Sequence, residues 1–582
     1  MTTPAPAKED ASTPQSASHY LLATLAELGI EYIFANTGTD HAPLIEEAAR
    51  WRQDGLTPPE FILCPHENTA AHMAGGYALV TGQGQPVLVH VDAGTANAAV
   101  GMHNLFRTRL PAMLMAGKAP FSSHGELSGT RDNYVHFVQE PMDQGALVRP
   151  YVKWEYTLQS AATTRETVLR ANAVMQSDPP GPVYLMLPRE TLTQSFDACD
   201  LPDLPLDLHG PTTMGGADPA SIAALGDKLL GAENPILVTS YAGLTDGASE
   251  AIDQLSGMTG MRVYEANMIA NISHDMPCFC GADAGEALAD ADFVLLLDTD
   301  VPYMPSQTPL GSQTFWAHVD RDTVKPATPI WSFPGNMRLT GNSARILSQL
   351  VDHVCANAGE DYRAAVGRRH QSIETSRLTM RANAIRAAAD PGSEGAINPA
   401  HLFARLSELL QPTDMVFHEA VRNQPHLVRQ LKRPLPKTLV RVAGGGLGAS
   451  GGMALGAKLA NPGVLAVQVV GDGSFYFNAP MSVFAVSRQY DLPILTIVLD
   501  NGGWSAVKTS NLKLYPEGHA KTRNEHASEL FGEAEFAHLA SVFGFEGVML
   551  SDPAKVADAL EHAVQTVRGG RSAIVHVRVT RH

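Results

Sequence analysis

Two apolar runs in the last third of the chain each end in residues that could bind a metal ion. VLAVQVV leads into GDGS (471–474), and PILTIVL leads into DNGGW (500–504). If both runs are strands of one open parallel sheet, their carboxyl ends lie at the edge where such sheets bind ligands. Asp472 and Asn501 offer the hard oxygen ligands that Mg²⁺ and Ca²⁺ prefer. The spacing therefore predicts a divalent cation site at this edge.

The GDGS turn also carries residues suited to a phosphate group. Gly471 and Gly473 have no side chain, so the backbone can approach a ligand closely. Ser474 is expected to open a helix, whose first N–H groups attract anions. Because the net charge is −18, a phosphorylated ligand needs a cation beside it.

Glu67 is a further candidate, an acid at the expected start of a helix. It follows the strand-like FILCP and lies in HENTAAHMAGGYA (66–78). The helix dipole alone favours a glutamate in a first turn. Its position therefore leaves both a structural and a proton-transfer role open.

Together these motifs resemble those of the thiamine-diphosphate-dependent enzymes, in the branch of acetolactate synthase and benzoylformate decarboxylase. The resemblance implies that thiamine diphosphate and Mg²⁺ are the cofactors. It assigns the metal to Asp472, the Asn501 side chain and the Gly503 carbonyl, and it assigns the bond to N1′ of the aminopyrimidine to Glu67. Asp500 departs from the family pattern, which has asparagine there, but the expected metal ligand is the following residue.

A glycine-rich stretch, GLGASG (446–451), allows two interpretations. It fits G-x-G-x-x-G after a strand, with Asp472 about 20 residues further on, so an NAD(P)-binding oxidoreductase is an alternative. The resemblance to thiamine enzymes instead implies that Leu447 lies between the two rings of the cofactor. The Gly445 carbonyl would then accept the 4′-amino group.

Two loops of the first domain carry further candidate catalytic residues. NTGTDHAP (36–43) resembles the Asn-Pro-Gly-Ser turn of the family, with Thr39 at the serine position. HVDAGTANAAVG (90–101) resembles the Gly-Thr-x-Asn loop, which puts His90 at the proton-transfer histidine of the benzoylformate decarboxylase branch. His41 is a second candidate, although isolated histidines near strand ends are often structural.

Trp504 and Lys508 follow the expected metal ligands, where a substrate would lie. Tryptophan offers an apolar wall, and lysine could attract a carboxylate or orient a carbonyl. Both residues could equally belong to a surface loop.

Helix and strand patterns alternate from about residue 19, which predicts an α/β fold with three doubly wound domains built on parallel sheets. The middle region shows no phosphate-binding fingerprint, so flavin is not expected there. We expect the following segments: a disordered tail (1–18), a pyrimidine-binding domain (19–194), a linker (195–218), a central domain (219–355), a helical linker (356–396) and a diphosphate-binding domain (397–582).

The composition excludes several classes of protein. An acidic chain lacks the basic surface that nucleic acid binding needs. No apolar run approaches the roughly 20 residues of a membrane span. The five cysteines form one close pair, Cys278 and Cys280, with no second pair or histidine cluster that would indicate zinc. A reducing cytoplasm is the expected location.

The expected activity is that of a lyase or carboligase. The resemblance implies decarboxylation of a 2-oxo acid such as pyruvate, and transfer of the acyl anion equivalent to an aldehyde, a ketone or an oxo acid. A 2-hydroxyacyl-CoA lyase and a simple 2-oxo acid decarboxylase are the alternatives. It also implies a homodimer or homotetramer, with the site between subunits.

Overall fold

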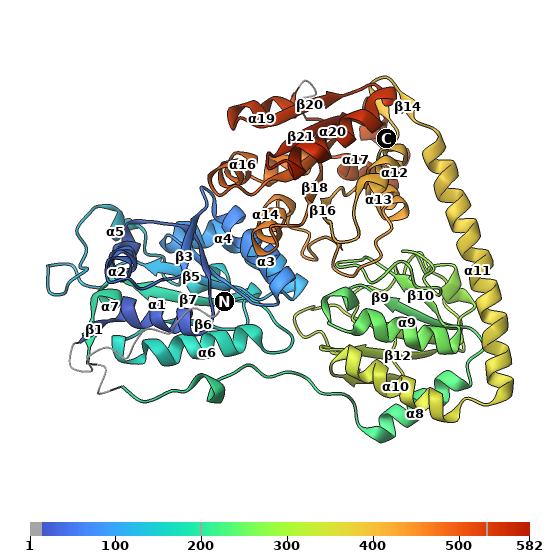
Figure 1. The fold of residues 1–582 in the computed structure, drawn as a ribbon, viewed down its shortest axis with the longest axis horizontal. Helices are drawn as coiled ribbons and strands as arrows, with labels where there is room; N and C mark the ends of the chain where they lie inside the picture. Colours follow the sequence, from blue (N-terminus) through green and yellow to red (C-terminus); the bar gives the residue numbers. More distant parts are fainter. Residues whose placement is uncertain (1–13, 198–200, 531–533, 582) are drawn as a thin grey trace. The chain divides into compact units, whose positions relative to one another are not determined.

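The computed structural model describes residues 14–197, 201–530 and 534–581 (Figure 1). These residues form two compact units. Unit 1 consists of the described part of Met1–Thr212 together with Val442–Gly463 and Tyr476–Leu492. Unit 2 consists of the described parts of Thr213–Arg441, Val464–Phe475 and Pro493–His582. Three large parallel sheets are present, so the expected α/β fold class is confirmed.

The first sheet has the strand order β3-β2-β4-β5-β7-β6, with every neighbouring pair parallel. Its central strands are buried and apolar, as expected for a sheet covered on both faces. The strands are β2 (Tyr32–Asn36), β3 (Glu60–Leu63), β4 (Pro86–Val89), β5 (Met113–Lys118), β6 (Glu155–Thr157) and β7 (Val183–Pro188). The helices are α1 (Ala17–Glu27), α2 (Ala42–Gln53), α3 (Glu67–Thr81), α4 (Val91–Thr108), α5 (Val135–Val138), α6 (Thr164–Gln176) and α7 (Arg189–Thr193).

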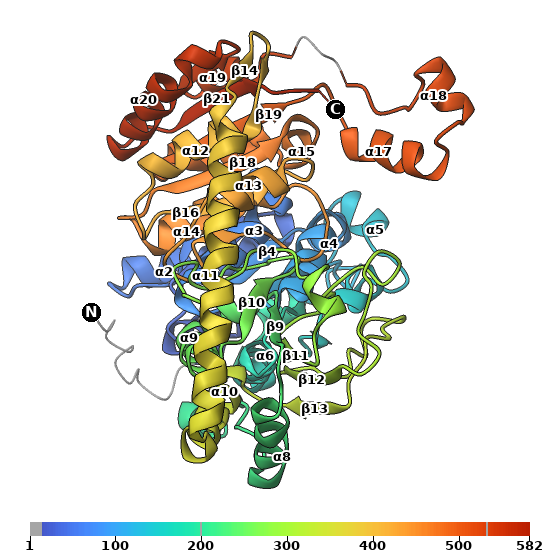
Figure 2. The same cartoon turned by 90° about the vertical axis from the view of Figure 1, so that its right-hand side faces the viewer.

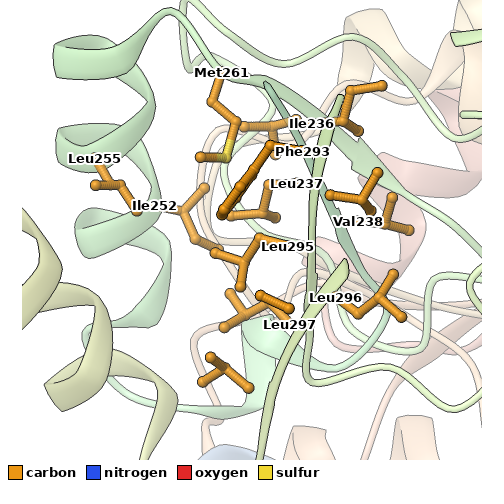
Figure 3. Packing of buried hydrophobic residues seen from close by; sticks show 14 of the residues in the cluster. Ile236, Leu237, Val238, Ile252, Leu255, Met261, Phe293, Leu295, Leu296 and Leu297 are labelled. Carbon is orange, nitrogen blue, oxygen red and sulfur yellow. The ribbon is translucent and has the colours of Figure 1, made fainter. Parts of the chain in front are cut away.

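The second sheet belongs to unit 2 and has the parallel order β10-β9-β11-β12-β13. Ile252 and Leu255 of α9 and Leu295 and Leu297 of β11 belong to one buried core cluster (Figure 3). The strands are β9 (Pro235–Thr239), β10 (Arg262–Glu265), β11 (Phe293–Leu297), β12 (Phe315–Asp320) and β13 (Met337–Thr340). The helices are α8 (Pro219–Leu230), α9 (Ala248–Thr259), α10 (Ser343–Asn357) and α11 (Glu360–Ala389).

The third sheet has the parallel order β17-β16-β18-β19-β21-β20. The strands are β16 (Met415–Glu419), β17 (Leu439–Val440), β18 (Ala466–Gly471), β19 (Ile494–Asp500), β20 (Glu546–Leu550) and β21 (Ala573–Arg578). The helices in this stretch of the chain are α12 (Pro399–Leu409), α13 (Gln424–Gln430), α14 (Ser450–Ala460), α15 (Asp472–Phe477), α16 (Pro480–Gln489), α17 (Ser505–Leu514), α18 (His519–Arg523), α19 (Leu539–Val542) and α20 (Val556–Arg568), of which α14 and α16 belong to unit 1.

Short pieces of structure lie in the segments expected to be tails or linkers. Strand β1 (Gln15–Ser16) pairs antiparallel with β8 (Ser195–Phe196), and α1 begins at Ala17. Regular structure therefore starts before residue 19; residues 1–13 of the expected tail lie outside the described chain. The expected helical linker contains α11, drawn in Figure 2 as one continuous helix. A two-stranded hairpin, β14 (Gly392–Ser393) and β15 (Ala396–Ile397), follows it.

None of the helices in the described ranges combines the length and the apolar character that a membrane crossing requires.

Helices α3 and α14 pack closely within unit 1 because glycines line their contact. A Cβ atom on Gly76 would lie 2.1 Å from the Met453 carbonyl oxygen. A Cβ atom on Gly456 would lie 2.0 Å from the Met73 carbonyl oxygen. No side chain fits at these distances. The glycines of the two motifs therefore set how near the helix backbones approach.

We expect Gly76→Ala to destabilise the protein by about 1–3 kcal/mol, because the new methyl group meets backbone and the two helices must move apart. Gly367→Ala is the matched control: Gly367 lies in α11, and a Cβ there has open space around it. It should be neutral or stabilising by up to about 1 kcal/mol. Urea unfolding followed by circular dichroism measures both, and equal effects would contradict the packing argument.

Candidate active site

The two expected metal-binding turns lie side by side in unit 2. Strand β18 ends at Gly471 and pairs with β19 in parallel, with Gly471 opposite Leu499. Asp472, the first residue of α15, is 4 % exposed. The Gly502 N–H donates a hydrogen bond to Asp472 Oδ2 over 3.1 Å. The strand ends therefore bring Asp472 next to the DNGGW turn, as the sequence predicts.

Asn501 presents an oxygen that could complete a cation site. Its Nδ2 donates to Ser505 Oγ at 3.1 Å, whereas its Oδ1 is buried and has no hydrogen-bond partner. A buried acceptor without a partner is costly unless a ligand satisfies it. Burial, together with the nearby charge of Asp500, raises the pKa of Asp472 to about 7. A divalent cation would satisfy the Asn501 oxygen and favour the charged form of Asp472, so the two residues fit such an ion.

The site does not depend on a cluster of ionisable ligands. Within the described ranges, no group of three or more His, Cys, Asp or Glu side chains is placed to hold a metal. One carboxylate, one amide and one backbone carbonyl suit Mg²⁺, which takes its remaining ligands from water and substrate phosphates.

The aspartate at position 500 is paired with basic residues of β21, which no local sequence pattern indicated. The register places Asp500 opposite Arg578. His576 Nε2 donates to Asp500 Oδ2 at 2.9 Å, and Arg578 lies 2.5 Å from the same oxygen. Burial raises the pKa of Asp500, but the His576 hydrogen bond and the Arg578 charge outweigh it and leave that pKa lowered. The departure from the family's asparagine is therefore matched by two basic residues.

The residues after Asn501 pack closely against neighbouring segments, including the GDGS turn. Gly503 has φ +138°, and a Cβ there would lie 2.2 Å from the Ser528 carbonyl oxygen, so only glycine fits. The Trp504 ring lies against Gly473, because a Cβ on Gly473 would be 2.3 Å from Trp504 Cδ1. Lys508 is half-buried, with its Nζ 3.4 Å from Asn524 Oδ1. Trp504 thus contacts the GDGS turn, whereas Lys508 contacts the loop that follows α18.

In unit 1, Glu67 is the first residue of α3 and is 8 % exposed. The Asn97 side chain of α4 donates to Glu67 Oε2 at 3.2 Å. A Cβ on Gly94, in the first turn of α4, would lie 3.4 Å from Glu67 Oε1. The carboxylate is therefore held between the first turns of two helices. The side chain of His66, the residue that caps α3, accepts from the Asn68 N–H.

The glycine-rich loop before α14 is fixed to α3 and α4 of the same unit. Asn68 Nδ2 donates to the Gly448 carbonyl at 2.7 Å. Asn104 Nδ2 donates to the Gly446 carbonyl at 2.8 Å, and Asn104 Oδ1 accepts from the Gly446 N–H at 3.1 Å. Gly445 is exposed with φ +73°, and Leu447 beside it is half-buried. The loop that would face the aminopyrimidine thus lies close to the amino-terminal turn carrying Glu67.

The other candidates of the first domain converge on an acid that the sequence analysis missed, Asp40. His90 Nδ1 forms a very short hydrogen bond with Asp40 Oδ1. His41 is fully buried, its Nε2 lies 3.2 Å from Asp40 Oδ2, and its Nδ1 accepts from the Gly38 N–H. Thr39 is exposed at the start of the same 3-10 turn. The sequence showed an Asp beside His41, but no local pattern indicated that His90 reaches it.

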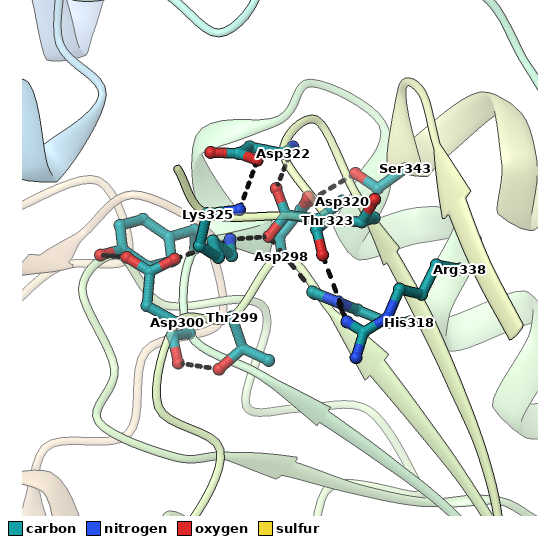
Figure 4. Close-up of polar contacts among 12 residues, drawn as sticks. Asp298, Thr299, Asp300, His318, Asp320, Asp322, Thr323, Lys325, Arg338 and Ser343 are labelled. Carbon is teal, nitrogen blue, oxygen red and sulfur yellow. Dashed lines mark hydrogen bonds and ion pairs between the residues drawn. The ribbon is translucent and has the colours of Figure 1, made fainter. Parts of the chain in front are cut away.

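The carboxyl end of the central sheet carries a separate polar network (Figure 4). Lys325 Nζ donates to Asp320 Oδ2 at 2.6 Å and lies 2.7 Å from Asp300 Oδ1. Ser343 Oγ donates to Asp298 Oδ2 at 2.5 Å. Three carboxylates thus stand at the edge where parallel sheets bind ligands. They would repel the phosphates of a flavin or another nucleotide; that this domain binds no flavin stays a prediction.

Comparisons with known proteins identify two domains. The family "Thiamine pyrophosphate enzyme, N-terminal TPP binding domain" matches residues 15–147, which include Glu67 and His90. The family "Thiamine pyrophosphate enzyme, C-terminal TPP binding domain" matches residues 424–577, which include Asp472 and Asn501. The predicted resemblance is confirmed. Because GLGASG lies inside the second match, we do not retain the dinucleotide alternative.

Relatives cover nearly the whole chain. It is 25% identical over 554 residues to the acetolactate synthase isozyme 3 large subunit of Escherichia coli (strain K12), covering 89% of this chain and 88% of that protein. It is 24% identical over 570 residues to a benzoylformate decarboxylase of Pseudomonas aeruginosa, covering 96% and 97%. Its fold matches the structure of the Rhodococcus jostii RHA1 thiamine diphosphate-dependent 4-hydroxybenzoylformate decarboxylase with a TM-score of 0.76 at 21% identity, covering 98% of this chain and 100% of that one.

We expect Asp472→Asn to weaken thiamine diphosphate binding in the presence of Mg²⁺ by at least about tenfold, since one charge partner of the cation is lost. Calorimetric titration with and without Mg²⁺ measures this effect. Asp558→Asn, at an exposed position in the first turn of α20, is the control and should bind like the wild type. Unchanged affinity in Asp472→Asn would show that the metal lies elsewhere.

Proposed function

Because this chain belongs to the thiamine-diphosphate-dependent enzyme family, of the acetolactate synthase and benzoylformate decarboxylase type, we propose that it is a carboligase. It decarboxylates a 2-oxo acid such as pyruvate and couples the acyl anion equivalent to an aldehyde, a ketone or a second oxo acid. The observation that carries this proposal is the Trp504 ring against Gly473, which forms an apolar wall at the phosphate-binding turn.

Each residue of the proposed site has a defined task. Thiamine diphosphate supplies the electron sink for carbon–carbon bond cleavage when it is bound. Asp472, the Asn501 side chain and the Gly503 carbonyl would hold Mg²⁺ for the diphosphate. Glu67 holds a proton toward N1′ of the aminopyrimidine, a task that suits a carboxyl group fixed by neighbours and largely shielded from water.

Two residues of the glycine-rich loop would orient the cofactor in this proposal. Leu447 would contact the rings of the cofactor, and the carbonyl of Gly445 would accept a hydrogen bond from its 4′-amino group. The positive φ at Gly445 and the paired Asn104 hydrogen bonds at Gly446 support a fixed loop conformation.

Simple decarboxylation is the second candidate function, and the His90–Asp40 pair favours it. A protonated histidine near the reacting carbon would release a free aldehyde. Decarboxylases of this family commonly use adjacent histidines for that step, and the sequence contains no His-His pair. A CoA ester is disfavoured as substrate by the carboxylates at the edge of the central sheet, which would repel its nucleotide.

The product distribution tests the proposal. With thiamine diphosphate, Mg²⁺ and pyruvate, an added aldehyde should yield hydroxyketone as the main product. Trp504→Ala should change the acceptor range more than the rate of CO₂ release. Glu67→Gln should retain cofactor binding but lose about 10²–10⁴-fold in CO₂ release. Calorimetry on both variants separates these effects from loss of the cofactor. Free aldehyde as the main product under saturating acceptor would identify a decarboxylase instead.

We further propose that the enzyme works as a homodimer or homotetramer. Segment 121–142 of unit 1 exposes seven large apolar side chains, which a second copy could cover. They are Phe121, Leu127, Tyr134, Val135, Phe137, Val138 and Met142.

Light scattering after size exclusion should give at least twice the mass of the 62.1 kDa chain. The double variant Phe137→Ser, Met142→Ser should shift the mass toward that of one chain at low concentration. Leu378→Ser, at an exposed position on α11, should not. A wild-type monomer under these conditions would contradict the proposal.

A further inference from the structure

We propose that Asp40 is the positioning residue that fixes the tautomer and the protonation of His90, so that His90 acts as an acid in the reaction. The inference rests on the proposed function, because both carboligation and aldehyde release need a proton at the product. Asp40 has no part in the family resemblance described above. It follows the Thr39 position of the turn, and only the folded chain brings it to His90.

The hydrogen bonds give the two nitrogens of His90 different roles. Nδ1 is paired with Asp40 Oδ1, and Nε2 lies 3.0 Å from Gln139 Oε1. The Asp40 side chain is 1 % exposed and that of His90 is 22 % exposed. A buried carboxylate accepts a hydrogen bond and fixes the proton on the nitrogen it faces. Nδ1 therefore keeps its proton, and Nε2, whose proton faces the amide oxygen of Gln139, is the nitrogen left to give up a proton.

Two glycines make room for this pair. A Cβ on Gly117 of β5 would lie 1.2 Å from Asp40 Oδ2, and a Cβ on Gly38 would lie 2.0 Å from His90 Nδ1. No larger residue could occupy either position without displacing the acid or the ring. The close approach is therefore built into the backbone on both sides of the pair.

The charges favour the protonated form of His90. The Asp40 hydrogen bond raises the pKa of His90 and outweighs burial, which lowers it. Burial raises the pKa of Asp40, but the hydrogen bond to His90 and the charges of His41 and His90 leave it lowered. Burial lowers the pKa of His41 itself. The other titratable groups facing the pair are Asp92 in the first turn of α4 and His136 in α5.

The proton balance of the step is simple. When a carbon–carbon bond forms, the oxygen of the acceptor carbonyl must gain a proton; when an aldehyde is released, the carbon that lost CO₂ must gain one. The Nε2–H bond of His90 breaks, and its proton passes to the product. The neutral ring keeps Nδ1–H bonded to Asp40, and solvent restores the proton on Nε2. The rate should therefore fall as pH rises through the raised pKa of His90.

The test measures the His90 pKa directly in cofactor-free protein. Protein labelled at histidine Cε1 is titrated by NMR, and His90→Gln assigns the signal. We expect Asp40→Asn to lower the His90 pKa by about one to three pH units, since an opposite charge at this distance is removed. The basic limb of the kcat–pH profile of the holoenzyme should move to lower pH by the same amount. Asp92→Asn is the control and should give a much smaller shift, because Asp92 forms its hydrogen bond with the Ala93 N–H rather than with His90.

The NMR titration and the kcat–pH profile together separate this inference from the proposed function. An unchanged His90 pKa in Asp40→Asn overturns the positioning role, whatever the enzyme produces. A shifted pKa with an unmoved basic limb overturns the role of His90 as the acid. If the wild type shows no thiamine-dependent turnover with any oxo acid, the proposed function fails and, with it, the acid role, while the NMR titration still decides whether Asp40 controls His90.

Discussion

Charge neutralisation at the ends of β18 and β19 is the constraint on which the diphosphate-binding part of the structure depends. The chain has 60 acidic and 42 basic residues, yet it belongs to a family whose cofactor is a diphosphate. Asp472 is buried next to Asp500, an arrangement that is unfavourable for two negative charges. His576 and Arg578 neutralise Asp500 from β21, which leaves Asp472 and the Asn501 oxygen for a cation. Glycine at 473 and 503 lets the two turns approach the Trp504 ring and the Ser528 carbonyl oxygen closely.

The first sheet concentrates its polar groups in the same way. Four neighbouring strands carry these groups at their carboxyl ends. Glu67 follows β3, Asp40 follows β2 and His90 follows β4. Gly117, which leaves room for the Asp40 side chain, lies near the end of β5. Parallel strands place all these positions along one edge, so residues far apart in sequence meet there. Glu67 accepts a hydrogen bond from Asn97, and Asp40 is paired with His90. In the proposed function, the same sheet would supply both the carboxylate for the cofactor ring and the acid–imidazole pair for the reacting atoms.

Sequence patterns were sufficient for the parts of this arrangement that depend on local spacing. Apolar runs ending in GDGS and DNGGW predicted adjacent strand ends, and the structure pairs those strands. The helix start at Glu67 was likewise readable from the chain. The Asp40–His90 pair and the Asp500–His576 bond were not, because each depends on strand order and register between distant segments.

The contact between α3 and α14 ties together stretches more than 350 residues apart in the chain. Since residues 442–463 and 476–492 belong to unit 1, the compact body built on the first sheet is completed only when the chain has been synthesised as far as Leu492. A fragment ending before α14 would leave the glycine-lined face of α3 open to water. During translation that face stays exposed until α14 has been made, and surface exposed in this way makes a partly folded chain prone to aggregation.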